Sequence, residues 1–85
     1  MALYKVEFTS SAKKELKKLP KPYIENIIES IAGLAAAPFP VGVKKMVGEE
    51  MYRIRVGPYR ILYEVEGRLM LILVIKIAHR KDVYR

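Results

Sequence analysis

The sequence predicts an α+β fold in which one N-terminal strand is followed by an antiparallel two-helix hairpin and an antiparallel meander of three or four strands. Three patterns support this prediction. Residues 4–8 alternate between apolar and charged side chains, residues 10–36 carry apolar residues at helical spacing, and residues 43–77 are rich in Ile, Val, Leu and Tyr between turn signals. With 85 residues, 52% of them hydrophobic, the chain can form one core. We therefore expect residues 1–85 to be a single domain with the helices on one face of the sheet.

The first helix follows the first strand almost directly. Ser10 and Ser11 can cap its N-terminus, and Pro20 ends it because proline lacks the backbone donor that a helix interior needs. Apolar positions at spacings of four and three define its inner face, and lysines cover its outer face: Ala12, Leu16 and Leu19 against Lys13, Lys14, Lys17 and Lys18.

The second helix begins near Pro22, which suits a first helical turn, and ends before Pro38. One apolar stripe runs along it at helical spacing: Ile24, Ile27, Ile28, Ile31, Leu34 and Ala35. Because the link between the helices is only a few residues long, we expect the two helices to run antiparallel.

The remaining chain predicts strands, the first of them weak: residues 43–47, 51–56, 59–65 and 69–77. Gly57-Pro58 suits a type II′ hairpin turn, and Glu66-Gly67 is a weaker two-residue turn signal. Residues 69–77 are apolar on both faces, so this strand should lie inside the sheet.

The Gly57-Pro58 turn fixes a register in which Arg55 pairs with Arg60. Both side chains then lie on one face, with Arg53 two residues along it. Like charges that face each other destabilise a sheet, so this cluster indicates a bound anion, and the planar guanidinium suits phosphate. The alternative is an ordinary solvent-exposed hairpin face. A two-residue turn at Glu66-Gly67 would place Arg60 roughly opposite Leu73.

The C-terminal residues should emerge beside the Arg55–Arg60 pair, at the Gly57-Pro58 end of the sheet. They bring three further candidates, His79, Arg80 and Tyr84, together with the cation Lys81. Taken alone, His79 is an ordinary polar residue, and Tyr84 is a packing or base-stacking aromatic. A single histidine without cysteines supplies no metal site, so we expect neither metal nor cofactor.

This set of side chains suits RNA cleavage without a metal. The ribose 2′-hydroxyl is the nucleophile, and the enzyme needs a base for its proton, cations for the phosphorane and an acid for the leaving oxygen. The residues alone do not decide between cleaving RNA and only holding its phosphates.

The charge and the apolar runs restrict the class of protein further. The net charge is +7, and residues 51–85 hold eight basic and three acidic side chains, which predicts an anionic partner. Lys13 and Lys17 are either a solvated helix face or contacts to ribosomal RNA.

The chain has no glycine-rich phosphate loop, no N-terminal signal core and no apolar run long enough to span a bilayer. We therefore expect a cytoplasmic protein without a membrane partner.

Residues 51–64 (MYRIRVGPYRILYE) and 79–84 (HRKDVY) resemble the RelE-type toxins of toxin–antitoxin systems. The opening strand, the helix at residues 12–16 and the Leu19-Pro20 break are also similar, so the resemblance covers the whole chain. It implies a RelE-like fold and a ribosome-dependent mRNA endoribonuclease that cleaves A-site codons and leaves a 2′,3′-cyclic phosphate. It also implies a cognate RelB-like antitoxin with an acidic segment, and contact with operator DNA only through the antitoxin complex.

The resemblance also implies residue roles. Arg60 holds the scissile phosphate, Arg80 is an acid or charge stabiliser, and Tyr84 takes the 2′-hydroxyl proton. Arg53 and Arg55 contact and stabilise the phosphate, Arg55 as a catalytic residue as well, and His79 assists proton transfer. Three lysines are expected from their charge to contact RNA: Lys13, Lys17 and Lys81. The related ParE toxins, which share the fold but inhibit DNA gyrase, are the alternative, although they generally lack the Arg60, Arg80 and Tyr84 set. A relative that only binds antitoxin and DNA is a third.

Overall fold

A computed structural model describes residues 3–46, 51–79 and 81. The elements follow in the order β1 (Lys5–Phe8), α1 (Ser10–Lys17), α2 (Lys21–Leu34), β2 (Lys44–Lys45), β3 (Met51–Val56), β4 (Tyr59–Glu66), the 3₁₀ turn η1 (Gly67–Leu69) and β5 (Leu71–His79). This order confirms the predicted α+β class, with a strand and two helices before the meander.

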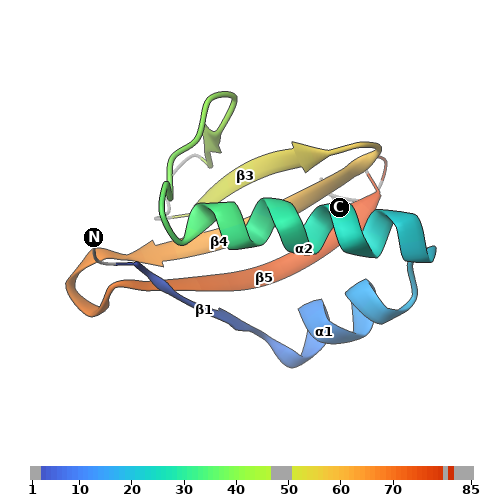
Figure 1. The fold of residues 1–85 in the computed structure, drawn as a ribbon, viewed down its shortest axis with the longest axis horizontal. Helices are drawn as coiled ribbons and strands as arrows, with labels where there is room; N and C mark the ends of the chain where they lie inside the picture. The colour runs from blue at the N-terminus through green and yellow to red at the C-terminus, as the bar shows by residue number, and fades with distance from the viewer. Residues whose placement is uncertain (1–2, 47–50, 80, 82–85) are drawn as a thin grey trace.

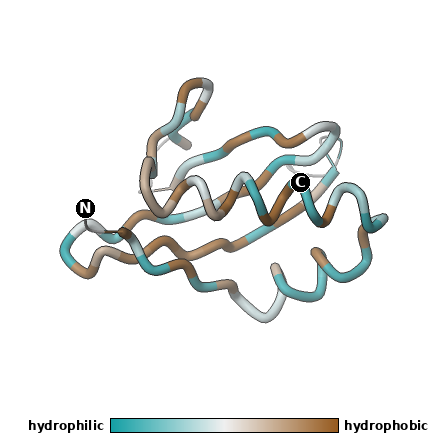
Figure 2. Tube along the Cα trace, in the orientation of Figure 1, coloured by the Kyte–Doolittle hydropathy of each residue, from teal (hydrophilic) through white to brown (hydrophobic). Residues whose placement is uncertain are grey.

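The strands form one mixed sheet in the order β1-β5-β4-β3-β2. β1 runs parallel to β5, and the other neighbours pair antiparallel. β5 therefore lies inside the sheet, as its two apolar faces predict, and Figure 2 shows it apolar over most of its length. The helices cover one face and run in opposite directions (Figure 1). Within the described residues, no helix is long and apolar enough to cross a membrane.

The hydrophobic core lies between the helices and the covered face of the sheet. Its buried members come from both helices and from the three meander strands: Ala12, Ile27, Ile31, Leu34, Ile54, Ile61, Tyr63, Ile72, Val74 and Ile77. Val6 and Phe8 pack against them from β1, as the alternation along this strand predicts. Burial of these side chains provides the main driving force for folding.

The cap of α1 differs from the prediction, because Thr9 rather than Ser10 or Ser11 occupies the N-cap. Thr9 Oγ1 accepts a hydrogen bond from the Ala12 amide at 3.1 Å and donates one to the Ile75 carbonyl at 3.1 Å. β1 ends opposite Val74, so the carbonyl of Ile75 has no strand partner on that side of β5. Thr9 satisfies this carbonyl instead. The cap therefore joins α1 to the sheet.

The connection between β4 and β5 corrects a second expectation. Gly67–Leu69 form a 3₁₀ turn and Met70 adopts a left-handed conformation with φ of 51°, so β5 starts at Leu71 instead of residue 69. A bulge follows, because Leu62 pairs with Lys76 while Tyr63 pairs with Val74. The longer turn and the bulge together place Arg60 opposite Ala78, not near Leu73.

Tyr63 links the sheet to the loop that follows α2. Its ring is fully buried, and its hydroxyl donates a 2.6 Å hydrogen bond to the Pro38 carbonyl. Burial, with a smaller contribution from Tyr52, raises the pKa of Tyr63 from 10.0 to about 12. The folded protein therefore favours the protonated phenol.

The stability contributed by Tyr63 should fall as the pH rises from about 10 to about 12. The folded pKa lies above the unfolded value of ~10, so the unfolded chain loses its proton first, and the loss amounts to about 2–3 kcal/mol. The measurement is urea unfolding at pH 8 and near pH 12 for the natural chain and for Tyr63→Phe. The substitution should lower stability by about 1 kcal/mol at pH 8 through the lost hydrogen bond. It should also make the decline between the two pH values shallower, and an equal decline in both proteins would contradict the assignment.

Gly33 lies in the C-terminal half of α2, where a Cβ atom would meet no atom within 4 Å. Glycine destabilises a helix relative to alanine because it loses more backbone freedom on folding. We expect Gly33→Ala to raise the free energy of unfolding by about 0.5–1 kcal/mol. Urea unfolding of the two proteins measures the change, and a decrease would show that the side of α2 next to Gly33 is more crowded than the structure indicates.

Candidate functional site

The β3–β4 hairpin has the register that the sequence predicts. Arg55 pairs with Arg60, flanked by the pairs Val56–Tyr59 and Ile54–Ile61, and Gly57 in the turn has a φ of 59°. A type II′ turn requires this positive φ at its first central position, while Pro58 supplies the negative φ at the second. Ile54 and Ile61 belong to the core below the helices, so Arg55 and Arg60 lie on the opposite face of the sheet, which the helices leave uncovered.

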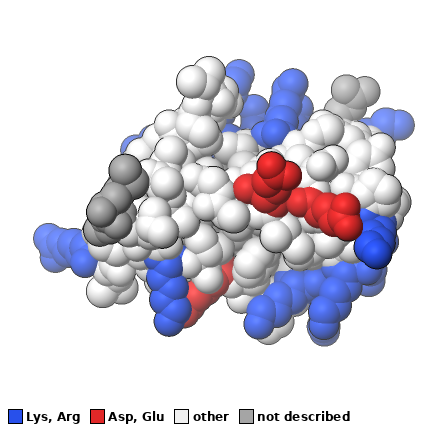
Figure 3. Space-filling view, viewed as in Figure 1, with Lys and Arg blue, Asp and Glu red and all other residues white. Residues whose placement is uncertain are grey.

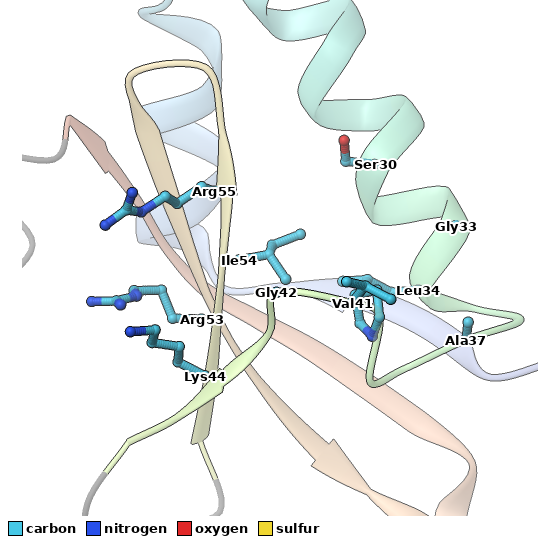
Figure 4. A pocket seen from close by; sticks show the side chains of 11 residues that line it. Ser30, Gly33, Leu34, Ala37, Val41, Gly42, Lys44, Arg53, Ile54 and Arg55 are labelled. Atoms are coloured by element: carbon cyan, nitrogen blue, oxygen red, sulfur yellow. The ribbon is translucent and has the colours of Figure 1, made fainter.

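The uncovered face gathers further positive charge. Arg53 lies two residues from Arg55 on the same face, and β2 places Lys44 opposite Arg53. In Figure 4 the side chains of Lys44, Arg53 and Arg55 all extend to the side of β3 that faces away from α2. We call these three residues together with Arg60 the basic face. The opposite side of the molecule differs, because Figure 3 shows acidic side chains over α2 and basic ones toward the margins.

The arginines of the basic face fall into two groups by burial. Arg53 and Arg60 are 7% and 9% exposed, whereas Arg55 is exposed to solvent. Arg53 and Arg60 both have interaction partners. Such partners are needed because burying a guanidinium costs free energy unless it is paired or hydrogen-bonded. The face therefore combines two fixed charges with an accessible one, an arrangement that suits binding of a phosphodiester.

His79 lies at the expected end of the sheet but on the other face. It pairs with Tyr59, and side chains of directly paired residues share a face. The His79 and Tyr59 rings pack edge to face at 5.8 Å, and the Tyr59 ring packs on Tyr23 of α2 at 5.1 Å. His79 Nδ1 accepts a hydrogen bond from the Lys81 amide at 3.3 Å. The expectation that His79 joins the arginine cluster is therefore wrong for its side chain, which instead packs on the helix side and closes the turn after β5.

The other candidates from the sequence lie apart or outside the described residues. Arg80 and Tyr84 lie outside them, and Lys81 is exposed. Lys13 and Lys17 are exposed on α1, where they flank a shallow apolar hollow of about 260 Å³ with Phe8, Leu16 and Ile28. The hollow lies on the helix side, so the structure does not bring these lysines to the basic face.

Two contributors to the site are absent from the sequence interpretation. Lys44 joins the basic face only because β2 pairs with β3, and the weak strand signal at residues 43–47 gives no register. Glu15 accepts hydrogen bonds from the Ile77 amide at 3.0 Å and from Lys76 Nζ at 3.2 Å, which holds the end of β5. A lone glutamate among helix lysines gives no sequence signal for this role. Among the described residues, no group of three or more His, Cys, Asp or Glu side chains could hold a metal ion.

Comparison with known proteins extends over nearly the whole chain. Residues 6–84 match the family described as the ParE toxin of the type II toxin–antitoxin system parDE. The toxin RelG of Mycobacterium tuberculosis is 33% identical over 86 residues, which covers 96% of this chain and 97% of RelG. The putative toxin RelE1 of Methanocaldococcus jannaschii is 31% identical over 86 residues, covering 96% of each chain.

Solved structures show the same architecture. The archaeal RelE–RelB complex from Pyrococcus horikoshii has a TM-score of 0.84 at 29% identity and covers 95% of this chain and 99% of its counterpart. The RelBE2 toxin–antitoxin complex from Mycobacterium tuberculosis has a TM-score of 0.82 at 29% identity, covering 96% of this chain and 97% of its counterpart. The sequence match and the structural match agree, and together they show that this chain is a RelE-type toxin belonging to the ParE toxin family of type II toxin–antitoxin systems.

Proposed function

We propose that this toxin is a ribosome-dependent mRNA endoribonuclease that cuts the codon in the ribosomal A site and so inhibits translation. The observation that carries the proposal is the Arg55–Arg60 pair on the uncovered face of the sheet. Arg55 is exposed to solvent and lies directly opposite Arg60, so an anion that binds Arg55 has a second guanidinium group beside it. An RNA phosphodiester is an anion of suitable shape for two planar forks.

The proposed reaction is an internal transfer at phosphorus. The ribose 2′-oxygen attacks the adjacent phosphorus and the bond to the 5′-oxygen breaks, which leaves a 2′,3′-cyclic phosphate and a 5′-hydroxyl. Arg60 holds the scissile phosphate, and Arg55 stabilises the charge that develops on the phosphorane. Arg53 contacts the neighbouring backbone, where Lys44 adds a further cation.

The base for the 2′-hydroxyl proton must lie outside the basic face, because an arginine stays protonated and cannot accept a proton. We assign the base for the 2′-hydroxyl proton to Tyr84, and charge stabilisation or proton donation at the leaving oxygen to Arg80. The packing of His79 on Tyr59 favours a positioning role for this histidine over direct proton transfer. Replacing His79 with phenylalanine keeps the ring contact with Tyr59 and removes both proton transfer and the hydrogen bond from the Lys81 amide, so an unchanged cleavage rate would show that the ring contact alone is needed.

Macromolecular partners follow from the same proposal. The relatives from Pyrococcus horikoshii and Mycobacterium tuberculosis were solved as toxin–antitoxin complexes, so we propose a RelB-like antitoxin with an acidic segment for this chain. Operator DNA would then be reached only through that complex. Lys13, Lys17 and Lys81 are exposed, and we propose that they contact ribosomal RNA. The proposed partners are then the ribosome and mRNA, and the proposed location is the cytoplasm.

A reconstituted translation reaction tests the proposal. Purified toxin is added to a defined mRNA with and without ribosomes, and new 5′ ends are mapped by primer extension. The expected result is cuts within codons that require ribosomes and carry a 5′-hydroxyl. Intact mRNA in the presence of folded toxin would overturn the proposal.

Inhibition of DNA gyrase is the second candidate, because the family that residues 6–84 match is described as the ParE toxin. A supercoiling assay with purified gyrase and this toxin distinguishes the two functions. We expect supercoiling to continue unchanged at toxin concentrations that support mRNA cleavage. Inhibited supercoiling together with intact mRNA would favour the ParE-like function.

A further inference from the structure

Three aromatic rings join the tip of the β3–β4 hairpin to α2 and to the end of β5. The Tyr59 ring packs edge to face on Tyr23 of α2 at 5.1 Å and on His79 of β5 at 5.8 Å. A Cβ atom at Gly57 would lie 3.5 Å from Cε1 of Tyr23, so the Tyr23 ring also lies against the hairpin turn. Figure 1 shows the start of α2, the β3–β4 turn and the end of β5 at one end of the molecule. We call Tyr23, Tyr59 and His79 the aromatic clamp.

The tip of the hairpin has little support from the sheet. β2 pairs only with Arg53 and Tyr52, so the rest of β3 toward the turn has β4 on one side and, among the described residues, no strand on the other. Arg55 and Arg60 pair at this tip, and directly opposed like charges do not stabilise a strand pair. Side-chain packing on the helix side therefore contributes much of what holds the tip in place.

Tyr59 connects this packing to the basic face. Tyr59 and Arg60 are neighbours on β4, so their side chains leave the strand on opposite faces. The Tyr59 ring is held between rings from two other elements on the helix side, and Arg60 extends from the adjacent backbone unit to the other side. A shift of the Tyr59 ring would therefore move the backbone that carries the Arg60 guanidinium.

Tyr23 is well placed to hold Tyr59 because it lies on a fixed part of α2. The helix begins at Lys21 with a proline in its first turn, and the Tyr23 amide donates a hydrogen bond to the Pro20 carbonyl at 3.0 Å. The residue is nevertheless 36% exposed, so it contributes ring contacts more than buried area. Removing the ring would loosen the clamp without opening the core.

We infer that Tyr23 is a positioning residue for the proposed reaction, which acts through Tyr59 to hold the backbone of Arg60. This inference rests on the proposed function. A donor that is fixed before the phosphorane forms stabilises its charge without having to reorganise, so the position of Arg60 affects the rate directly. Tyr23 itself lies on the helix side, where it touches neither the RNA nor the reacting atoms of the proposed mechanism.

Single-turnover cleavage of mRNA on programmed ribosomes tests the inference with Tyr23→Leu, which removes the ring but keeps an apolar side chain and a good helix former. We expect the maximal rate to fall by about tenfold to a hundredfold, the scale for displacing a group at the site by up to about 1 Å. The toxin concentration that gives half the maximal rate should not change, because the exposed cations that bind RNA are retained.

Two control variants accompany Tyr23→Leu. Tyr23→Phe keeps the ring contacts and should cleave at the natural rate. Ile28→Ala removes an apolar side chain that is 49% exposed on the same helix, outside the aromatic clamp, and should also leave cleavage unchanged. Far-ultraviolet circular dichroism and urea unfolding show whether each variant is folded under the assay conditions.

The histidine provides a second readout that needs neither mRNA nor ribosomes. His79 is the only histidine of the chain, so its ring protons can be followed by nuclear magnetic resonance in the tag-free protein. The nearby Tyr59 ring shifts these resonances through its ring current. Tyr23→Leu should move them toward the values of an unstructured peptide, whereas Tyr23→Phe and Ile28→Ala should leave them in place. A Tyr23 side chain that only stabilised the fold would not move them in a folded variant.

A double substitution tests whether Tyr23 acts through Tyr59. Tyr23→Leu combined with Tyr59→Leu should cleave no more slowly than Tyr59→Leu alone, because residues that act in series are not additive. Multiplied effects, a folded Tyr23→Leu toxin with the natural rate, an equal rate loss in Ile28→Ala, or His79 resonances that Tyr23→Leu leaves unmoved would each overturn the inference. If the natural toxin leaves mRNA intact, the proposed nuclease function fails. Displaced His79 resonances in Tyr23→Leu would then still support the clamp, and unmoved ones would overturn it.

Discussion

Arg60→Ala is expected to lower the rate of ribosome-dependent mRNA cleavage by about 10²–10³-fold, the effect of removing one fixed donor from a transition-state oxyanion site. Arg60 has this weight because it is 9% exposed and held by its partners, so its charge requires little reorganisation when the phosphorane forms. Single-turnover cleavage on programmed ribosomes, measured with saturating toxin, reports the chemical step.

The controls for Arg60 separate a lost charge from a lost fold. Arg68→Ala removes an exposed arginine in η1, outside the basic face, and should leave cleavage unchanged. Arg60→Lys keeps one charge but loses the planar fork, so its rate should lie between those of the natural toxin and Arg60→Ala. A folded Arg60→Ala toxin that cleaves at the natural rate would remove Arg60 from the mechanism.

The local turn chemistry explains why the arginines of the basic face could be predicted from the sequence. Gly57-Pro58 allows one hairpin type with a two-residue loop, and that loop length fixes every pair along β3 and β4. The Arg55–Arg60 pair follows directly. The helices could also be predicted from the sequence, because the apolar stripe of α2 and the prolines at its ends are local signals.

The features of the site that the sequence does not predict depend on contacts between segments that are distant in the chain. The bulge in β5 and the four-residue connection before it shift the register of β5, and neither has a strong local signal. The resulting pairing puts His79 beside Tyr59, on the face away from the arginines. Likewise, Lys44 joins the basic face through a two-residue strand whose pairing is decided by β3.

The Arg55–Arg60 pair also shows why a stable sheet and a functional one differ. Directly opposed like charges destabilise a strand pair, by about 0.2–1 kcal/mol on the scale of cross-strand contacts. A sequence selected for stability alone would place opposite charges there, such as those of the exposed Lys5–Glu7 pair on β1. The like-charged pair instead lies in the β3–β4 hairpin, whose uncovered face carries the proposed reaction.

Glu15→Ala should lower the free energy of unfolding by about 1–3 kcal/mol, the range for leaving a buried polar group without its partner. Glu15 Oε1 accepts the hydrogen bond of the Ile77 amide, and Ile77 is 2% exposed, so little water can replace the carboxylate. β1 has already ended at this level of the sheet, and α1 supplies the pairing that a neighbouring strand would otherwise give. Urea unfolding measures the loss, and hydrogen exchange at the Ile77 amide should become faster.

Glu15→Gln distinguishes the hydrogen bond from the ion pair with Lys76. The amide oxygen of glutamine can still accept from Ile77, whereas the charge that Lys76 contacts at 3.2 Å is lost. Both side chains of that ion pair are partly exposed, so its loss should lower stability by about 0–1 kcal/mol. We expect Glu15→Gln to keep slow exchange at Ile77 and most of the cleavage rate, and Glu15→Ala to lose both. Cleavage should respond because β5 ends at His79, two residues after Ile77 and directly before Arg80, so losing the Ile77 hydrogen bond loosens this end of the strand. Equal losses in the two variants would show that the charge of Glu15, and not its hydrogen bond to the strand, positions this end of the site.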